Sequence, residues 1–193
     1  MKTLLITTAA IAAAFAFAAP TAATTYIGTR HVGAATAQLS ITTDGTLGVL
    51  AFGNITDYTI GLSDPGHSTT LFGPLSGNNS GFVVLGSALS ATATQLLFDF
   101  GGPGGAGFGD THSQYCITGN GFNCFPSGEF TEQIFFFTPP ASEVTYDNLQ
   151  VLGTAVPGGV PEPASWALMM AGFGLTGAAM RRRGARLTYS AAA

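Results

Sequence analysis

Two short pairs of histidine and aspartate are the side chains that could do chemistry in the middle of the chain. His67 follows Asp64 by three residues, and His112 follows Asp110 by two. A histidine beside a carboxylate can act as a general base or bind a metal ion. Such pairs also arise in turns, where Asp, Gly and Pro cluster for conformational reasons. No G-x-S-x-G or H-E-x-x-H motif is present, so the sequence predicts no catalytic residue and leaves these four as first candidates for a metal site.

Oxygen-rich turns offer a second kind of metal chemistry. Asp44-Gly45, Gly77-Asn78-Asn79 and Gly109-Asp110 carry the carboxylate and amide oxygens that calcium prefers. The spacing D-x-D-x-D-G, which would define a calcium loop, is missing. We therefore predict no cofactor, and structural calcium is an alternative to ordinary solvated turns.

A glycine-rich segment matches the consensus of a nucleotide-binding motif. Residues 102–107, GPGGAG, satisfy G-x-G-x-x-G and follow a predicted strand. That motif holds pyrophosphate at the N-terminus of a helix that its last glycine opens. Residues 108–113 have no amphipathic helical pattern. We expect a loop between strands here and no dinucleotide site.

Cys116 and Cys124 are the only cysteines, and a polar segment rich in Gly and Asn separates them. In an exported protein such a pair predicts a disulfide. A zinc site would need further ligands, and nothing nearby would activate a catalytic cysteine. The disulfide is therefore the expected state.

Charge is distributed very unevenly along the chain. Arg30 is the only lysine or arginine between residues 24 and 156, against nine acidic residues, so this part has a formal charge of −8 although the whole chain has −4. A protein needs several cations to neutralise a row of phosphates. Binding to nucleic acid or to anionic lipid is thus disfavoured. Neutral polysaccharide, or divalent cations that bridge an anionic polymer, remain open as partners.

Residues 24–156 read as an all-β domain, because turn signals recur every eight to twelve residues and no segment has helical periodicity. The clearest prediction is a hairpin of 37–42 against 47–52 with a turn at Asp44-Gly45. Further strands are predicted at 55–62, 69–72, 82–85, 95–100, 114–118, 130–138 and 149–155.

The predicted strand at 130–138 contains Ile134-Phe135-Phe136-Phe137, which places large apolar groups on both of its faces. A strand buried on both faces favours two packed sheets. We expect a single antiparallel β-sandwich, with a jelly roll as one open form. The many phenylalanines are expected in its core rather than in an aromatic platform for sugars.

Both ends of the chain carry targeting signals. Met1-Lys2 and the apolar run 4–19 predict a signal peptide at 1–23, cleaved after Ala23. Cleavage after Ala18 is a rival, and a permanent N-terminal anchor is disfavoured by the weakly hydrophobic, Ala-rich run.

At the other end, the uncharged residues 164–180 are predicted to form a transmembrane helix of about 25 Å, close to the thickness of the hydrocarbon layer. A buried core helix would have a polar face, which this segment lacks. The tail 181–193 should stay in the cytoplasm, because translocating its arginines is costly. These arginines form the membrane stop: Arg181, Arg182, Arg183 and Arg186.

The linker 157–163 ends in Pro161-Glu162-Pro163, and these prolines favour an extended, accessible backbone. The stretch 160–186 resembles the PEP-CTERM sorting domain of Gram-negative, matrix-producing bacteria in its PEPxxWA form. The residues that match are Pro161, Glu162, Pro163, Trp166 and Ala167. The resemblance covers only the tail. It implies recognition by an exosortase, a membrane-embedded cysteine enzyme that cuts near the motif and releases or transfers the protein to the cell surface.

Together these features predict a non-enzymatic protein that is secreted through the inner membrane, anchored there transiently and then sorted to the cell surface or extracellular matrix. The resemblance implies a structural or adhesive role with exopolysaccharide in a biofilm. A carbohydrate-binding module is the alternative. A secreted hydrolase is a third hypothesis, which would need two carboxylates in one cleft.

Overall fold

The computed structural model describes residues 22–124, 128–137, 141–156, 169–174 and 177. Within these residues the chain forms two antiparallel β-sheets and very little helix. The first sheet has eight strands, in the order β3 (Gly48–Val49), β7 (Leu89–Ala91), β8 (Gln95–Asp99), β13 (Leu149–Ala155), β1 (Thr24–Val32), β2 (Ala35–Thr43), β4 (Ile55–Ser63) and β5 (Ser68–Phe72).

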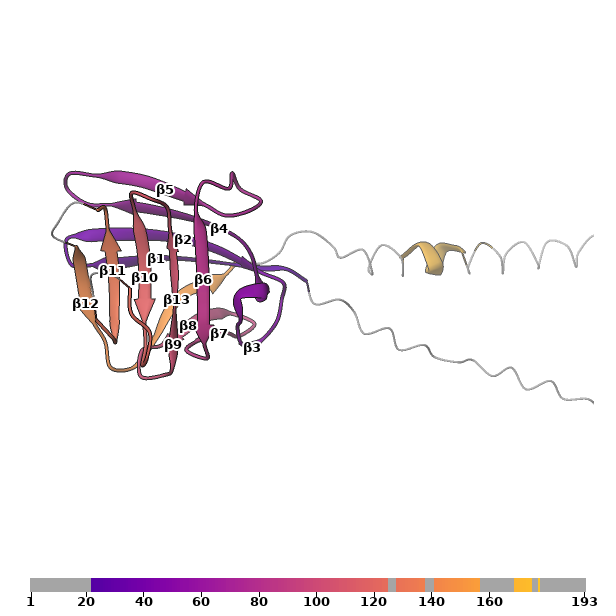
Figure 1. Ribbon diagram of the computed structural model, residues 1–193. Helices are drawn as coiled ribbons and strands as arrows, with labels where there is room; N and C mark the ends of the chain where they lie inside the picture. The colour runs from indigo at the N-terminus through magenta and orange to yellow at the C-terminus, as the bar shows by residue number, and fades with distance from the viewer. Residues whose placement is uncertain (1–21, 125–127, 138–140, 157–168, 175–176, 178–193) are drawn as a thin grey trace, which may run out of the picture. The chain divides into compact units, whose positions relative to one another are not determined.

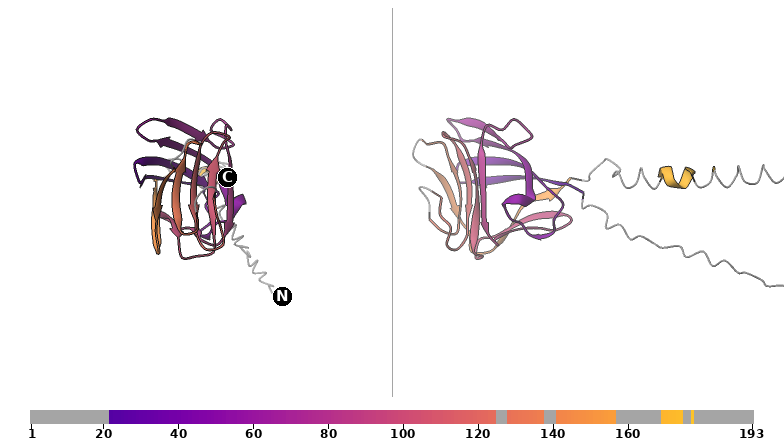
Figure 2. Two further views of the ribbon diagram at one scale, coloured as in Figure 1. Left: turned by 60° about the vertical axis from the view of Figure 1, so that its left-hand side comes forward. Right: turned by 45° about the vertical axis from the view of Figure 1, so that its right-hand side comes forward.

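The second sheet has five strands, in the order β12 (Ser142–Thr145), β11 (Thr131–Phe135), β10 (Gln114–Thr118), β9 (Gly104–Gly109) and β6 (Gly81–Gly86). A short 3₁₀ turn, η1 (Phe52–Asn54), leads into β4. In Figure 1 the strands of this sheet run vertically and cross β1, β2, β4 and β5, which run across the view. Such steep crossing is the arrangement of orthogonally packed sheets. Figure 2 shows the two layers from other sides.

One hydrophobic core fills the space between the sheets. The ring of Tyr58 in β4 lies 5.0 Å from that of Phe108 in β9, and Phe108 lies 6.4 Å from Tyr115 in β10. All three are buried, as are Phe98 and Phe100. The Tyr58–Phe108 contact is edge-to-face and the Phe108–Tyr115 contact is stacked, and both kinds add to the free energy gained by burial. Most of the phenylalanines that the structure places in strands thus serve the core, as the sequence predicted.

Alternating side chains decide which face of each strand points inward. In β4, Tyr58, Ile60 and Leu62 are buried, the set predicted to share one face, and so is Ile55 at the start of the strand. In β2, Ala37, Leu39 and Ile41 are buried, and their neighbours are more exposed. The period of two in the sequence therefore predicted both strands correctly.

The predicted hairpin of 37–42 against 47–52 is wrong. β2 pairs with β1 and β4, whereas Gly48–Val49 pairs with β7 at the far edge of the same sheet. Asp44 does turn the chain, since its carboxylate accepts hydrogen bonds from the Thr46 N–H and the Asn54 side chain. A turn signal specifies a change of direction but not the partner strand, and here the long strands β1 and β4 compete successfully for β2.

The segment 102–107 is not a loop throughout, because β9 begins at Gly104 and runs to Gly109. Ala106 and Phe108 face the core, and Gly105 and Gly107, which alternate with them, face the opposite side of the sheet. Glycine is common in turns, but here it marks a strand on which other groups pack closely. Strands β1, β7 and β12 were also missing from the sequence-based prediction.

The predicted strand 130–138 is shorter in the structure. β11 covers Thr131–Phe135, and its five residues are all buried, so it is covered on both faces as expected. Phe130 and Phe137 have positive φ values of 62° and 51°, which no continuing strand allows. The strand order also differs from a jelly roll, since β9 to β12 form a simple meander.

The two sheets are joined by a buried ion pair. Arg30 in β1 places Nη2 2.6 Å from Oε2 of Glu132 in β11, and its Nε also lies 3.0 Å from Oε1. Tyr115 donates its hydroxyl proton to the same carboxylate at 2.6 Å, and the guanidinium lies 5.4 Å from the centre of the Tyr146 ring. The side chains of Arg30 and Glu132 are 12% and 0% exposed. The carboxylate is therefore fully desolvated, and Arg30 and Tyr115 both donate hydrogen bonds to it.

This buried environment shifts the pKa values of Arg30 and Tyr115. Burial lowers the pKa of Arg30, but the hydrogen bonds and charge of Glu132 outweigh it and raise the pKa above its ordinary value. Burial, reinforced by the negative charge of Glu132, raises the pKa of Tyr115 well above its ordinary value. Arg30 therefore stays charged and Tyr115 stays neutral, which keeps both as donors to the carboxylate.

The targeting segments lie mostly outside the described residues. This applies to the predicted signal peptide 1–23 for all but residues 22 and 23, and to the linker 157–163 and the tail 181–193. Of the predicted span 164–180, residues 169–174 and 177 are described, and they are helical with Met169, Met170 and Phe173 exposed. In the parts of the chain that can be described, no helix is long and apolar enough to cross a membrane.

Breaking the inter-sheet ion pair should be costly. Glu132→Gln leaves the Arg30 charge buried without a counter-ion, and we expect a loss of about 3–5 kcal/mol in the free energy of unfolding. Urea titration followed by circular dichroism measures it. Glu143→Gln, on an exposed side chain of β12, is the matched control and should change stability by less than about 0.5 kcal/mol. Equal effects of the two variants would show that the pair contributes nothing.

Candidate functional site

The first predicted pair lies on the surface. His67 and Asp64 flank the turn between β4 and β5, with His67 Nδ1 3.1 Å from Asp64 Oδ1. The Asp64 carboxylate also accepts the backbone N–H groups of Gly66 and His67, so it organises the turn itself. The His67 ring stacks against Phe136 at 5.4 Å. Both residues therefore have structural roles, since Asp64 orders the turn and His67 packs against Phe136.

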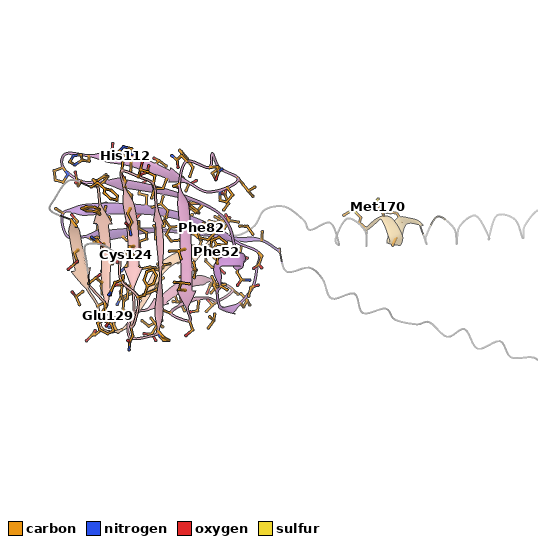
Figure 3. The ribbon with its side chains drawn as sticks, viewed as in Figure 1. Phe52, Phe82, His112, Cys124, Glu129 and Met170 are labelled. Carbon is orange, nitrogen blue, oxygen red and sulfur yellow. A yellow bond between two sulfur atoms is a disulfide. The ribbon has the colours of Figure 1, made fainter. Side chains whose placement is uncertain are left out.

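The second pair has the same character. Asp110 accepts the backbone N–H groups of His112 and Ser113, at 2.7 Å each, in the turn between β9 and β10. His112 Nδ1 lies 2.8 Å from the hydroxyl of Thr111. In Figure 3, His112 and Glu129 lie at opposite ends of the five-stranded sheet.

The structure does not combine the two turns into one metal site. Among the described residues, no group of three or more His, Cys, Asp or Glu side chains could hold a metal ion. In all three turns considered for calcium, oxygen atoms accept hydrogen bonds from nearby protein groups. Asp44 accepts from Thr46 and Asn54, Asn79 accepts from the Phe72 N–H, and Asp110 accepts as described above. Structural calcium stays a prediction.

The predicted disulfide joins Cys116 in β10 to Cys124, and both cysteines are buried. The ring that it closes folds back over the outer face of the five-stranded sheet. Backbone hydrogen bonds hold its start, since the N–H groups of Gly119 and Asn120 donate to the carbonyls of Gly104 and Gly102.

Glycines on the outer face of β9 make room for this ring. A Cβ atom added to Gly105 would lie 2.1 Å from Cδ1 of Phe122, so the phenylalanine ring occupies the space above that residue. Above Gly107 the nearest atoms are those of Val83 and of the two cysteine sulfurs, at 3.5–3.8 Å. Because glycine has no side chain, the outer face of β9 leaves a hollow beside the ring.

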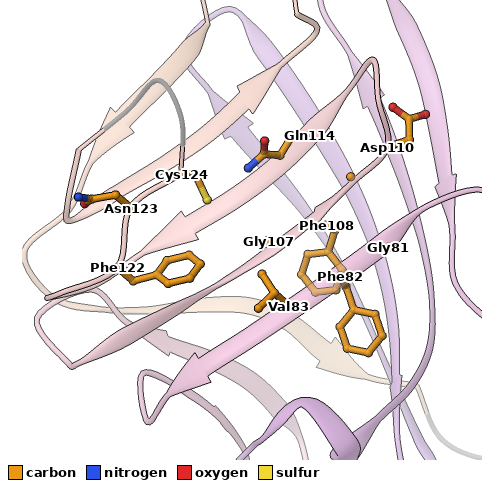
Figure 4. A pocket seen from close by; sticks show the side chains of 11 residues that line it. Gly81, Phe82, Val83, Gly107, Phe108, Asp110, Gln114, Phe122, Asn123 and Cys124 are labelled. Atoms are coloured by element: carbon orange, nitrogen blue, oxygen red, sulfur yellow. The ribbon is translucent and has the colours of Figure 1, made fainter.

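This hollow is a groove of about 530 Å³ on the outer face of the sheet. Figure 4 shows Phe122, Val83, Cys124 and Gln114 around Gly107, with Asp110 toward one end. The groove is lined by residues from β6, β9, the turn after β9, the start of β10 and the disulfide ring: Gly81, Phe82, Val83, Gly107, Phe108, Gly109, Asp110, Gln114, Phe122, Asn123 and Cys124.

The lining combines an aromatic ring with neutral hydrogen-bonding groups. Phe122 is partly exposed, the amides of Gln114 and Asn123 can both donate and accept, and Asp110 can accept. No lysine, arginine or histidine contributes. Ligand sites of this size usually pair an apolar wall with a few polar groups. The arrangement can bind a neutral, hydroxyl-bearing molecule.

Of the sequence-predicted site residues, the structure brings Asp110 and Cys124 into this groove, while Asp64 and His67 lie elsewhere. Phe122 was missed, and so was the role of the glycines. The signal was available in Gly105-Ala106-Gly107-Phe108-Gly109, where glycine alternates with larger residues at the period of a strand. Such alternation indicates a strand with one face left clear.

A two-sheet β domain with an outer-face groove defines a structural class but no function. The comparison with family models adds one finding, which concerns the tail: residues 159–183 match the PEP-CTERM protein-sorting motif. The chain therefore carries the sorting motif that its C-terminal sequence resembled. The motif indicates an exported protein that an exosortase-type enzyme processes and that is sorted at the membrane toward the cell surface. No curated protein and no solved structure matches the chain.

The residues of the sorting motif, Pro161, Glu162, Pro163, Trp166 and Ala167, lie outside the described residues. So do the arginines of the predicted membrane stop. Their roles in recognition and topology therefore rest on the sequence match.

The disulfide should contribute measurably to stability. Replacing both cysteines by alanine removes a closed ring, and the loop-entropy model gives a loss of about 2–3 kcal/mol. Thermal and urea unfolding of the oxidised protein and of the Cys116→Ala/Cys124→Ala variant measure it. Adding a reductant should destabilise the natural protein and leave the variant unchanged, and a reductant without effect on either would contradict the prediction.

Proposed function

We propose that this chain is a non-enzymatic protein of a Gram-negative cell surface or extracellular matrix, with a structural or adhesive role among exopolysaccharides. The observation that carries the proposal is the match of residues 159–183 to the PEP-CTERM sorting motif. In the proposed course, the signal peptide directs the chain through the inner membrane. The segment 164–180 then anchors it there until an exosortase cuts near Pro161-Glu162-Pro163.

The chemistry of the sandwich supports a neutral partner. Arg30, the only lysine or arginine of residues 24–156, is engaged by Glu132 between the sheets. Its side chain is 12% exposed, so residues 24–156 offer no freely accessible lysine or arginine side chain. A surface of this kind repels polyanions, and a neutral polysaccharide pays no such electrostatic cost.

Processing of both ends tests the sorting part of this proposal. We expect protein recovered from the envelope or medium of its native host to have an intact mass that fits cleavage after Ala23 and near residues 161–163. The mass should also show two hydrogen atoms fewer than the reduced protein, as a disulfide requires. A full-length, uncut chain in the cytosol would contradict the proposal.

A strain that lacks the gene separates sorting from the matrix role. Biofilm cohesion and surface composition should change in that strain and recover when the gene is restored. If neither changes while the mass result holds, the protein is sorted as proposed but has no role in the matrix.

The groove favours a second candidate function, a carbohydrate-binding module. Its aromatic wall and uncharged amides are suited to the apolar faces and the hydroxyl groups of a neutral sugar. The partner would then be held at one site instead of by the surface as a whole.

Titration calorimetry with cellohexaose, maltohexaose and dextran tests this second function. Saturable binding is expected for at least one glycan, and Phe122→Ala should weaken it about tenfold or more, since it removes the aromatic wall. Phe137→Ala, which truncates a 50% exposed ring outside the groove, is the control and should bind normally. Absence of saturable binding, or equal loss in both variants, would exclude the groove as a sugar site.

A further inference from the structure

The two sheets have four edge strands, and three of them are protected against pairing with another chain. Proteins protect edges by keeping them short, by placing charge on them or by covering them. β3 has only two residues. β12 has four residues, among them the exposed Glu143.

The third protected edge, β5, is covered by a side chain. Asn79 accepts a hydrogen bond from the Phe72 N–H at 2.7 Å and donates one to the Thr70 carbonyl at 2.9 Å. The amide thus takes the place of a neighbouring strand. The Ser80 hydroxyl also donates to the Phe72 carbonyl, at 3.0 Å.

The fourth edge, β6, is neither short nor charged. Its sequence, GFVVLG, has six residues without charge or proline. Its side chains Val83 and Leu85 are 38% and 55% exposed on the outer face. β6 pairs with β9, and no other strand of the described residues pairs with it. The 3₁₀ turn η1 meets it through the ring of Phe52, which stacks on Phe82 at 4.4 Å.

Uncharged, β-branched segments of this length are the ones that pair most readily with their own kind. In an antiparallel pair, alternate residues direct their N–H and C=O groups to the same side. β6 therefore bonds to β9 through one set of residues and presents the backbone groups of the other set at its free edge.

We propose that β6 is a self-association edge, at which it pairs antiparallel with β6 of a second copy of this chain. The two five-stranded sheets then form one continuous sheet about a two-fold axis. Identity of the partners makes this contact self-complementary. The formal charge of −8 on residues 24–156 would oppose association elsewhere, but β6 places no like charges opposite each other.

This pairing has a consequence for the groove. A two-fold axis perpendicular to a sheet keeps equivalent faces on the same side. Val83 belongs to β6 and also lines the groove, so a dimer presents two grooves close together on one face. Two adjacent sites raise the strength of attachment to a repetitive polymer without any new contact. Self-association itself does not depend on what the groove binds.

The test compares two matched substitutions in the exported protein, purified from cells that express the full-length gene. Leu85→Lys places a charge on the free edge, outside the groove lining. Leu149→Lys changes a side chain of the same exposure, 55%, on β13, which lies inside the other sheet. Sedimentation velocity over a range of concentrations should show a reversible dimer for the natural protein and for Leu149→Lys. Leu85→Lys should weaken association about tenfold or more.

Hydrogen exchange identifies the surface directly. The amides of residues 81–86 should exchange more slowly as the protein concentration rises, while those of β12 should not change. A monomer at every concentration, equal effects of the two substitutions, or slower exchange at another edge would overturn the proposal. Unchanged melting temperatures of both variants keep loss of folding from being mistaken for loss of pairing.

Discussion

The ion pair between Arg30 and Glu132 is the constraint on which the rest of the sandwich depends. It joins the central part of one sheet to the other, and it uses the single guanidinium group of residues 24–156 in the interior. A charge buried in this way is tolerated only with a counter-ion and further hydrogen bonds, which Glu132 and Tyr115 supply. The surface of residues 24–156 is consequently left without a freely accessible lysine or arginine side chain. The same contact therefore joins the two sheets and removes the arginine from the surface, which disfavours the binding of anionic polymers.

The outer face of the five-stranded sheet follows a different constraint, the absence of side chains on β9. Gly105 and Gly107 let the disulfide ring lie against the sheet, and Phe122 takes the space that a side chain at Gly105 would need. The groove is the part of this space that the ring does not fill. Its shape thus comes from backbone exposure and a covalent closure, whereas the hydrophobic core on the other side of β9 follows the usual rules of burial.

The edges of the two sheets impose a third constraint. A sandwich must end its sheets somewhere, and unpaired backbone groups at each end either meet water or another chain. β5 is satisfied by Asn79, and β3 and β12 are short. β6 is longer and uncharged, and it borders the groove. β6 therefore contributes to both the free edge and the groove. We expect pairing at the edge to affect ligand binding in the groove.

The sequence by itself determined the sorting motif, the class of fold, the disulfide and the inward faces of β2 and β4, because each depends on local spacing, on period or on a pair of unique residues. It could not determine that β2 pairs with β1 and β4, because a turn signal does not specify which strands pair. It also could not determine that Gly104–Gly109 is a strand, because glycine is found both in turns and where groups pack closely. Arg30 was visible as a lone cation, but its partner lies 102 residues away. Only the tertiary structure decided that contact, the groove and the open edge, because all three arise where distant segments meet.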